Sequence, residues 1–107
     1  LVQARCDVNQ ADESGATPAH FAAHEGHTAT LGVLVKARCD VNRAMKDGAT
    51  PAHFAAQNGH TATLGVLVQA GCNVNQAGQN GGTPAHIAAL KGHTAALKVL
   101  VGAGCDV

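Results

Sequence analysis

One stretch of this sequence returns twice at a fixed interval of 33 residues. It runs from Gly15 to Ala23 and reads Gly-Ala-Thr-Pro-Ala-His-Phe-Ala-Ala, and close copies occupy residues 48–56 and 81–89. A Gly-His-Thr-Ala block keeps the same interval, starting at residues 26, 59 and 92, and so does a cysteine at residues 6, 39, 72 and 105. A period of this length is typical of stacked repeat architectures, in which each repeat is one small structural unit. The search for function therefore starts from the array.

The composition offers little material for one large globular core. The 107 residues include no Trp, no Tyr, two Phe and one Met, so apolar burial must come from many small contacts between neighbouring units. Lys plus Arg and Asp plus Glu are seven each, which gives no electrostatic reason to expect nucleic acid or an anionic membrane surface as a partner. No apolar run approaches the ~20 residues of a membrane span, and the first residues lack the build of a signal peptide. We therefore expect a soluble protein without a membrane partner.

The four cysteines favour free thiols over a disulfide framework. Equivalent positions in adjacent helical repeats lie about 8 to 10 Å apart, whereas the Cα atoms of a disulfide are closer than about 7 Å. We therefore expect a reducing, intracellular compartment, either cytoplasmic or nuclear. The absence of Cys-x-x-Cys argues against a structural zinc site, and each cysteine is predicted to act as a small buried hydrophobe at a repeated position.

The period predicts a single domain over residues 1–107 that is divided into repeats. Residues 1–11 match the closing third of a repeat, residues 12–44 and 45–77 are full repeats, and residues 78–107 form a near-complete one. Within a repeat, Thr17 is a good N-cap and Pro18 suits the first helical position, so a helix begins there and ends near Gly26. A second helix is expected from about Thr28 to Ala37, followed by an extended loop or hairpin that leads to Gly48.

Helices this short are marginal when isolated, because about 12 to 15 residues are needed even for modest helicity in water. Each pair of helices must therefore be stabilised by the next pair. Such arrays are quasi-one-dimensional, and they leave an elongated surface on which the sequence can vary without disturbing the stack.

The repeated motifs resemble the ankyrin repeat family over essentially the whole chain. The resemblance rests on Thr-Pro-Ala-His with Ala-Ala, then Gly-His, an aliphatic helix and a Val-Asn pair, all in the same order in successive repeats. It implies a mostly α fold, an ankyrin-repeat solenoid of stacked helix-turn-helix units joined by hairpin-like loops. It also implies a non-catalytic protein-protein interaction module, with no enzyme activity, cofactor or small-molecule substrate.

The sequence departs from the family pattern at several positions. The family usually has Leu where this chain has Ala19, Ala52 and Ala85, which thins the core. The residue that ends the second helix is a glycine in the family, and Gly71 and Gly104 follow that pattern. Arg5 and Arg38 stand at the equivalent positions, where a left-handed conformation is predicted to be strained.

Six of the seven histidines are periodic, which favours a structural role. The resemblance implies that their imidazoles bond the Thr hydroxyl and nearby backbone and so join one unit to the next. His24 alone breaks the pattern, and with His20 and His27 it forms a cluster with the spacing of a helical metal site. Because His20 and His27 are committed to structural roles, we predict no metal site.

Positions that differ between otherwise similar units are the candidate contact surface. They fall at the hairpin tips and near the end of each first helix, two zones that form the concave contact surface in ankyrin-like proteins. Leu90 is the most informative, since an exposed aliphatic side chain beside Lys91 is a plausible anchor. The candidate partner-binding residues are Glu13, Ser14, His24, Glu25, Lys46, Asp47, Gln57, Asn58, Gln79, Asn80, Leu90 and Lys91.

Two alternatives remain open at this point. The chain could be a structural spacer or an engineered scaffold without its own ligand, in which case the variable positions are only solvated. Separately, Asn9, Asn42 and Asn75 occupy one repeated place, where the resemblance implies a structural role and occasional hydroxylation.

Overall fold

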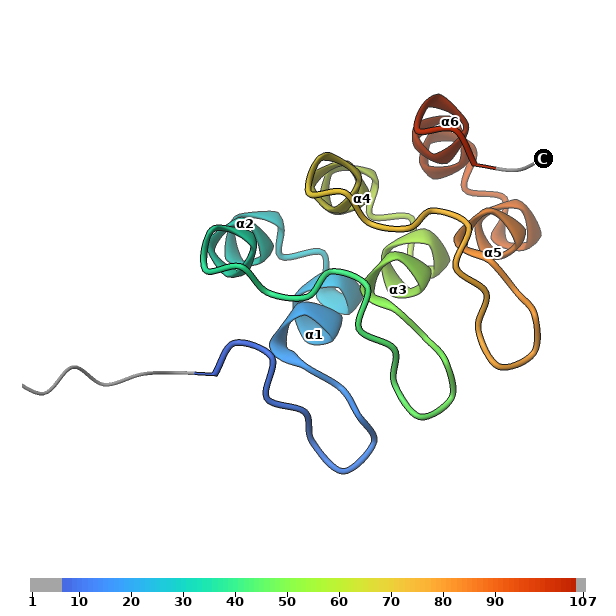
Figure 1. Cartoon of the computed structure of the whole chain (residues 1–107). Coiled ribbons are helices and arrows are strands. Elements are labelled where there is room, and N and C mark those ends of the chain that lie inside the picture. The colour runs from blue at the N-terminus through green and yellow to red at the C-terminus, as the bar shows by residue number, and fades with distance from the viewer. Residues whose placement is uncertain (1–6, 106–107) are drawn as a thin grey trace, which may run out of the picture.

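The computed structural model describes residues 7–105, and this part of the chain contains six helices and no strand. Figure 1 shows them as three antiparallel pairs in a row. The helices are α1 (Pro18–Glu25), α2 (Thr28–Lys36), α3 (Pro51–Gln57), α4 (Thr61–Gln69), α5 (Pro84–Lys91) and α6 (Thr94–Gly102). The expected solenoid of helix pairs is confirmed, and the second helix ends at Lys36 with Ala37 as its C-cap.

The pairs stack into two layers (Figure 1). In the first layer α3 packs between α1 and α5, and in the second layer α4 packs between α2 and α6. The molecule is elongated, with principal extents of 51 × 25 × 21 Å. None of the helices between residues 7 and 105 has the length and apolar character needed to cross a bilayer.

The first helix of each pair begins and ends where its local sequence dictates. Thr50 and Thr83 cap α3 and α5 by accepting hydrogen bonds from the N3 amides, and Pro follows each Thr at N1, where a missing N–H costs nothing. At the other end of α1, Gly26 takes the left-handed conformation with a φ of 72°. These local signals set the length of the first-layer helices.

The core lies between the two layers and between successive pairs. The first layer contributes small residues, since Ala19, Ala23 and Ala52 are almost completely buried. The second layer contributes the large side chains, and Leu31, Leu64, Leu67 and Leu100 have no exposed surface. Alanine in one layer lets neighbouring helices approach, and leucine in the other fills the remaining space.

The cysteines differ from the prediction of uniform burial. Cys105 is buried, but Cys39 and Cys72 are only partly buried. Cys6 lies outside the described residues. Cys39, Cys72 and Cys105 are all free thiols, as expected.

The loops between pairs project from the first layer as hairpin-like excursions without strand pairing (Figure 1). Their tips are joined to one another along the stack. The Lys46 amide donates to the Ser14 carbonyl at 3.0 Å, and the Gln79 amide donates to the Asp47 carbonyl at 3.1 Å. The tips therefore form a continuous ridge beside the first-layer helices.

Arg5 lies outside the described residues, and Arg38 adopts the left-handed conformation that was predicted to be strained at this position. Its φ is +67°, and it is the only non-glycine residue with positive φ among residues 7–105. Replacing it by glycine relieves this strain, so we expect Arg38→Gly to raise the free energy of unfolding by about 1 kcal/mol. Urea unfolding followed by circular dichroism measures the change.

The equivalent glycine in the next pair supplies the control for Arg38. Gly71 has a φ of +86°, and a Cβ added there meets no atom within 4 Å. Gly71→Ala should therefore lose about 1 kcal/mol through backbone strain alone. If Arg38→Gly left the protein no more stable, the assigned strain would be absent.

Candidate functional site

The hairpin tips and the outer side of the first-layer helices form one surface, which we call the groove face. In α1, Ala19, Ala22 and Ala23 are buried against the stack. The side chains at Phe21, His24 and Glu25 have the i, i+3, i+4 spacing of one helix side, and all three are exposed. Since α3 and α5 repeat this sequence pattern, their equivalent positions continue the same surface.

All twelve candidate contact residues are exposed, both the six on hairpin tips and the six near helix ends. Leu90 has 82 % of its surface exposed, so the expected exposed aliphatic side chain is confirmed. Exposure places these residues in contact with solvent. Their role in binding stays a prediction.

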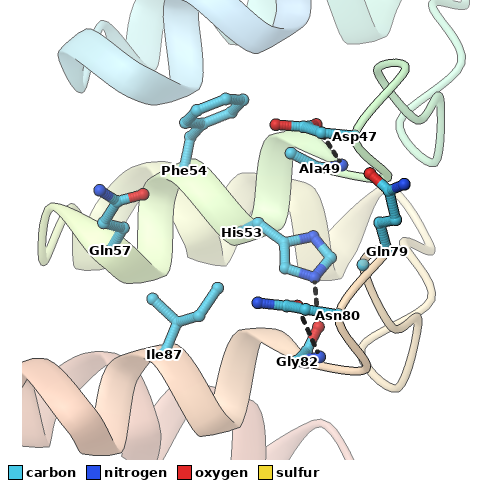
Figure 2. A pocket seen from close by; sticks show the side chains of 10 residues that line it. Asp47, Ala49, His53, Phe54, Gln57, Gln79, Asn80, Gly82 and Ile87 are labelled. Atoms are coloured by element: carbon cyan, nitrogen blue, oxygen red, sulfur yellow. Dashed lines mark hydrogen bonds between the residues drawn. The ribbon is translucent and has the colours of Figure 1, made fainter.

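Two hollows bring some of these residues together. The first, the α3–α5 hollow, encloses about 470 Å³ and lies between those helices and the tips beside them (Figure 2). His53 lies at its centre in this view, with Ile87 on one side and Asp47 and Gln79 at the tip side (Figure 2). Its lining consists of Asp47, Ala49, His53, Phe54, Gln57, Gly78, Gln79, Asn80, Gly82 and Ile87.

The second, the α1–α3 hollow, encloses about 300 Å³ and lies one repeat earlier. Seven of its eight lining positions correspond to positions of the first hollow displaced by 33 residues, so the groove face carries one hollow at each junction between successive pairs. Its lining consists of Asp12, Ser14, Ala16, His20, Phe21, His24, Met45 and Phe54. Phe54 lines both hollows and therefore separates them.

The hollows divide the twelve candidates into two groups. Six of them line a hollow, namely Ser14, His24, Asp47, Gln57, Gln79 and Asn80. The other six line neither: Glu13, Glu25, Lys46, Asn58, Leu90 and Lys91. Within this second group Asn58 has a structural bond, because its Nδ2 donates to the His24 carbonyl at 2.8 Å.

The sequence comparison missed the apolar residues of the groove face. Phe21 is 56 % exposed, and Phe54 and Ile87 at the equivalent positions are half-buried in the hollow walls. These positions were overlooked because they are alike in every unit, whereas the search selected residues that differ. Helical register identifies these positions. Each lies three residues before one candidate contact residue and four before the next, which places it on the same side of the helix.

His20 and His53 each join one helix pair to the next, which confirms the expected structural role. The Thr17 amide donates to Nδ1 of His20 at 2.9 Å, so Nε2 carries the proton and donates to the Ala49 carbonyl at 3.1 Å. His53 repeats this arrangement with Thr50 at 3.0 Å and with the Gly82 carbonyl at 2.9 Å. These hydrogen bonds require both imidazoles to be neutral, with the proton on Nε2.

The histidines that open the second helices make the reverse connection. Nε2 of His60 donates to the His24 carbonyl at 3.1 Å, and Nε2 of His93 donates to the Gln57 carbonyl at 3.0 Å. Between residues 7 and 105, no three His, Cys, Asp or Glu side chains are placed to hold a metal ion together. His24 instead packs edge-on against Phe54, with 5.5 Å between ring centroids.

The burial of His20 makes stability depend on pH. The side chain is 2 % exposed, and this burial lowers the pKa of His20 below its usual value of 6.5. The unfolded chain therefore binds more protons than the folded protein below about pH 6.5, so the contribution is complete above that pH and is lost as the pH falls. We expect the free energy of unfolding to be lower at about pH 5.5 than at about pH 7.5.

An NMR titration of the His20 Cε1–H resonance checks the cause directly. The midpoint for this ring should lie below 6.5. A midpoint at or above 6.5 would show that protonation of His20 does not oppose folding.

The repeated asparagines form a ladder at the turns that follow the second helices. Oδ1 of Asn9 accepts from the Asp40 amide at 2.7 Å, and Oδ1 of Asn42 accepts from the Asn73 amide at 2.6 Å. These bonds connect units 31 residues apart, which supports the expected structural role for both residues.

Comparison with known proteins supports the assignment of the repeats. A family model described as ankyrin repeats in three copies matches residues 1–78 and again residues 31–107. A comparison with curated proteins gave no match.

Proposed function

Because the chain belongs to the ankyrin repeat family, we propose that it is a non-catalytic module that binds a partner protein on its groove face. Ankyrin repeats are generally protein-protein interaction modules and are typically non-catalytic. The proposed partner-binding residues are the twelve exposed positions at the tips and helix ends, joined now by Phe21, Phe54 and Ile87.

The observation that carries the proposal is the exposed apolar lining of the hollows. Phe21 is not part of the buried core. More than half of its surface is exposed to water beside a hollow of about 300 Å³. An apolar surface of this kind, surrounded by amides and charges, is typical of a contact site. A chain acting only as a spacer has no need for a large aromatic side chain at this place.

Affinity capture with two matched variants separates the module from the spacer. The groove variant carries Phe21→Ala, Gln57→Ala and Leu90→Ala, and the control carries Val33→Ala, Lys36→Ala and Val101→Ala on the second layer. All six side chains are exposed, so both proteins should keep their fold. Quantitative mass spectrometry should show a protein captured by the parent chain and the control but lost with the groove variant.

Capture that is equal for all three proteins would contradict binding on the groove face. No protein captured above background by the parent chain would favour the spacer or scaffold. Circular dichroism of each variant verifies that a loss of capture is not a loss of fold.

We also propose that the protein resides in a reducing, intracellular compartment. The three cysteines among residues 7–105 are free, and burial raises the pKa of the Cys39 and Cys72 thiols above the ordinary value. A raised pKa keeps a thiol protonated and slow to react. Fractionation of cells that produce the parent protein tests this assignment, and recovery from a secreted fraction would overturn it.

A further inference from the structure

We propose that the groove face binds an extended, polyproline-II segment that carries an arginine three residues from a bulky aliphatic residue. The arginine occupies the α3–α5 hollow, and the aliphatic side chain occupies the α1–α3 hollow. This inference rests on the proposed function and specifies the chemistry of the partner.

Charge complementarity assigns the arginine to the α3–α5 hollow. Asp47 is the one acidic residue in its lining, and neither Lys46 nor Lys91 lines it. Ion pairs among the described residues join His24 to Glu25 and Arg43 to Asp40. Asp47 therefore has no cationic partner between residues 7 and 105. An incoming guanidinium could pair with this carboxylate.

The remaining walls of the α3–α5 hollow fit the rest of an arginine side chain. Gln57, Gln79 and Asn80 provide amide groups around the hollow, and Figure 2 shows them spread around His53. Ile87 and Phe54 provide apolar walls for the aliphatic stem. Arginine combines a planar set of N–H donors with an apolar stem, which suits a hollow of mixed polarity.

The α1–α3 hollow suits an uncharged aliphatic side chain. Phe21, Met45 and Phe54 form its apolar walls. Asp12 also lines it, but Oδ1 of that residue already accepts from the Ser14 amide and hydroxyl and from the Ala16 amide. Three hydrogen bonds within the tip therefore converge on Oδ1 of Asp12, whereas among residues 7–105 Oδ1 of Asp47 accepts one, from the Ala49 amide.

The spacing of the hollows selects the conformation of the segment. They lie one helix apart in the first layer, and packed helix axes are about 8 to 10 Å apart. A polyproline-II chain has three residues per turn and rises about 3.1 Å per residue, so residues i and i+3 lie on one side, ~9.3 Å apart. In a β-strand, side chains on one side recur every ~6.8 Å, which does not match this spacing.

The test uses eight-residue proline peptides with one leucine and one arginine, three residues apart, in both orders. Binding to the intact chain is followed by ¹⁵N NMR titration in low salt. We expect shifts of the Asp47, Gln79 and Phe54 amides for at least one order. A peptide with citrulline in place of arginine keeps the shape but lacks the charge, and it should bind about threefold to tenfold more weakly.

Asp47→Asn is the matched variant, because the next repeat already has an asparagine, Asn80, at the equivalent position. Oδ1 of Asn80 accepts from the Gly82 amide at 3.1 Å, as Oδ1 of Asp47 accepts from the Ala49 amide at 3.0 Å. The variant therefore keeps the turn and removes only the charge. Asp47→Asn should weaken binding of the arginine peptide by the same factor of about threefold to tenfold, and it should leave binding of the citrulline peptide unchanged.

Three results would overturn the inference: no binding of either order, equal binding of arginine and citrulline peptides, or equal binding to Asp47→Asn. A peptide in which one residue instead of two separates leucine and arginine places the arginine at i+2 and should bind more weakly. Equal affinity for this peptide would contradict the assigned spacing. If the peptides do not bind but affinity capture is still lost with the groove variant, only this inference is wrong. If the peptides do not bind and capture does not depend on the groove face, the proposed function is wrong as well.

Discussion

Leu64→Ala should lower the free energy of unfolding by about 3 kcal/mol, within the range of about 2 to 5 kcal/mol for a fully buried leucine. Leu64 has no exposed surface and lies in α4, which packs between α2 and α6. Its truncation leaves a cavity in the middle of the second layer. Urea unfolding followed by circular dichroism measures the loss.

Leu90→Ala is the matched control for the same chemical change. Leu90 is 82 % exposed, so its truncation should alter the free energy of unfolding by no more than about 0.5 kcal/mol. Comparable losses for both variants would mean that the second layer does not hold the core described above.

Gly48→Ala should cost about 2 to 4 kcal/mol, because two separate penalties combine at this position. The φ of Gly48 is +85°, a conformation that strains any residue with a Cβ. In addition, an added Cβ would lie 2.5 Å from the Gln79 amide nitrogen in the next hairpin tip. Backbone atoms cannot rotate away, so the two tips must separate.

Gly81→Ala isolates the strain from the contact. Gly81 holds the equivalent place with a φ of +84°, but an added Cβ meets no atom within 4 Å. This variant should lose only about 1 to 2 kcal/mol. The excess loss in Gly48→Ala then measures the contact between neighbouring tips, and equal losses would show that the tips do not touch in solution.

Local chemistry made much of the fold predictable from the sequence. Thr17 and Pro18 define a helix start, and Gly26 defines a helix end, without reference to the rest of the molecule. The strain at Arg38 was predictable for the same reason, because its repeat partner Gly71 shows which conformation that place requires.

Properties that depend on the surroundings of a residue were predicted less well. Cys39 was expected to be buried because it recurs, but it is only partly buried, whereas Cys105 at the equivalent position is buried. The hollows were not predictable, because each is built from a helix of one pair and the tip of the next. Phe21 was missed because the candidates were chosen among positions that differ between units, although it is exposed on α1.

The central claim is that each pair of helices is joined to the next by the same hydrogen bonds along the stack. The most direct test is NMR observation of the Nε2–H protons of His20 and His53. We predict that both exchange slowly and show nuclear Overhauser contacts to the chain 29 and 30 residues later, at residues 49–50 and 82–83. Ring protons that exchange freely, without contacts to those residues, would contradict the stacked arrangement.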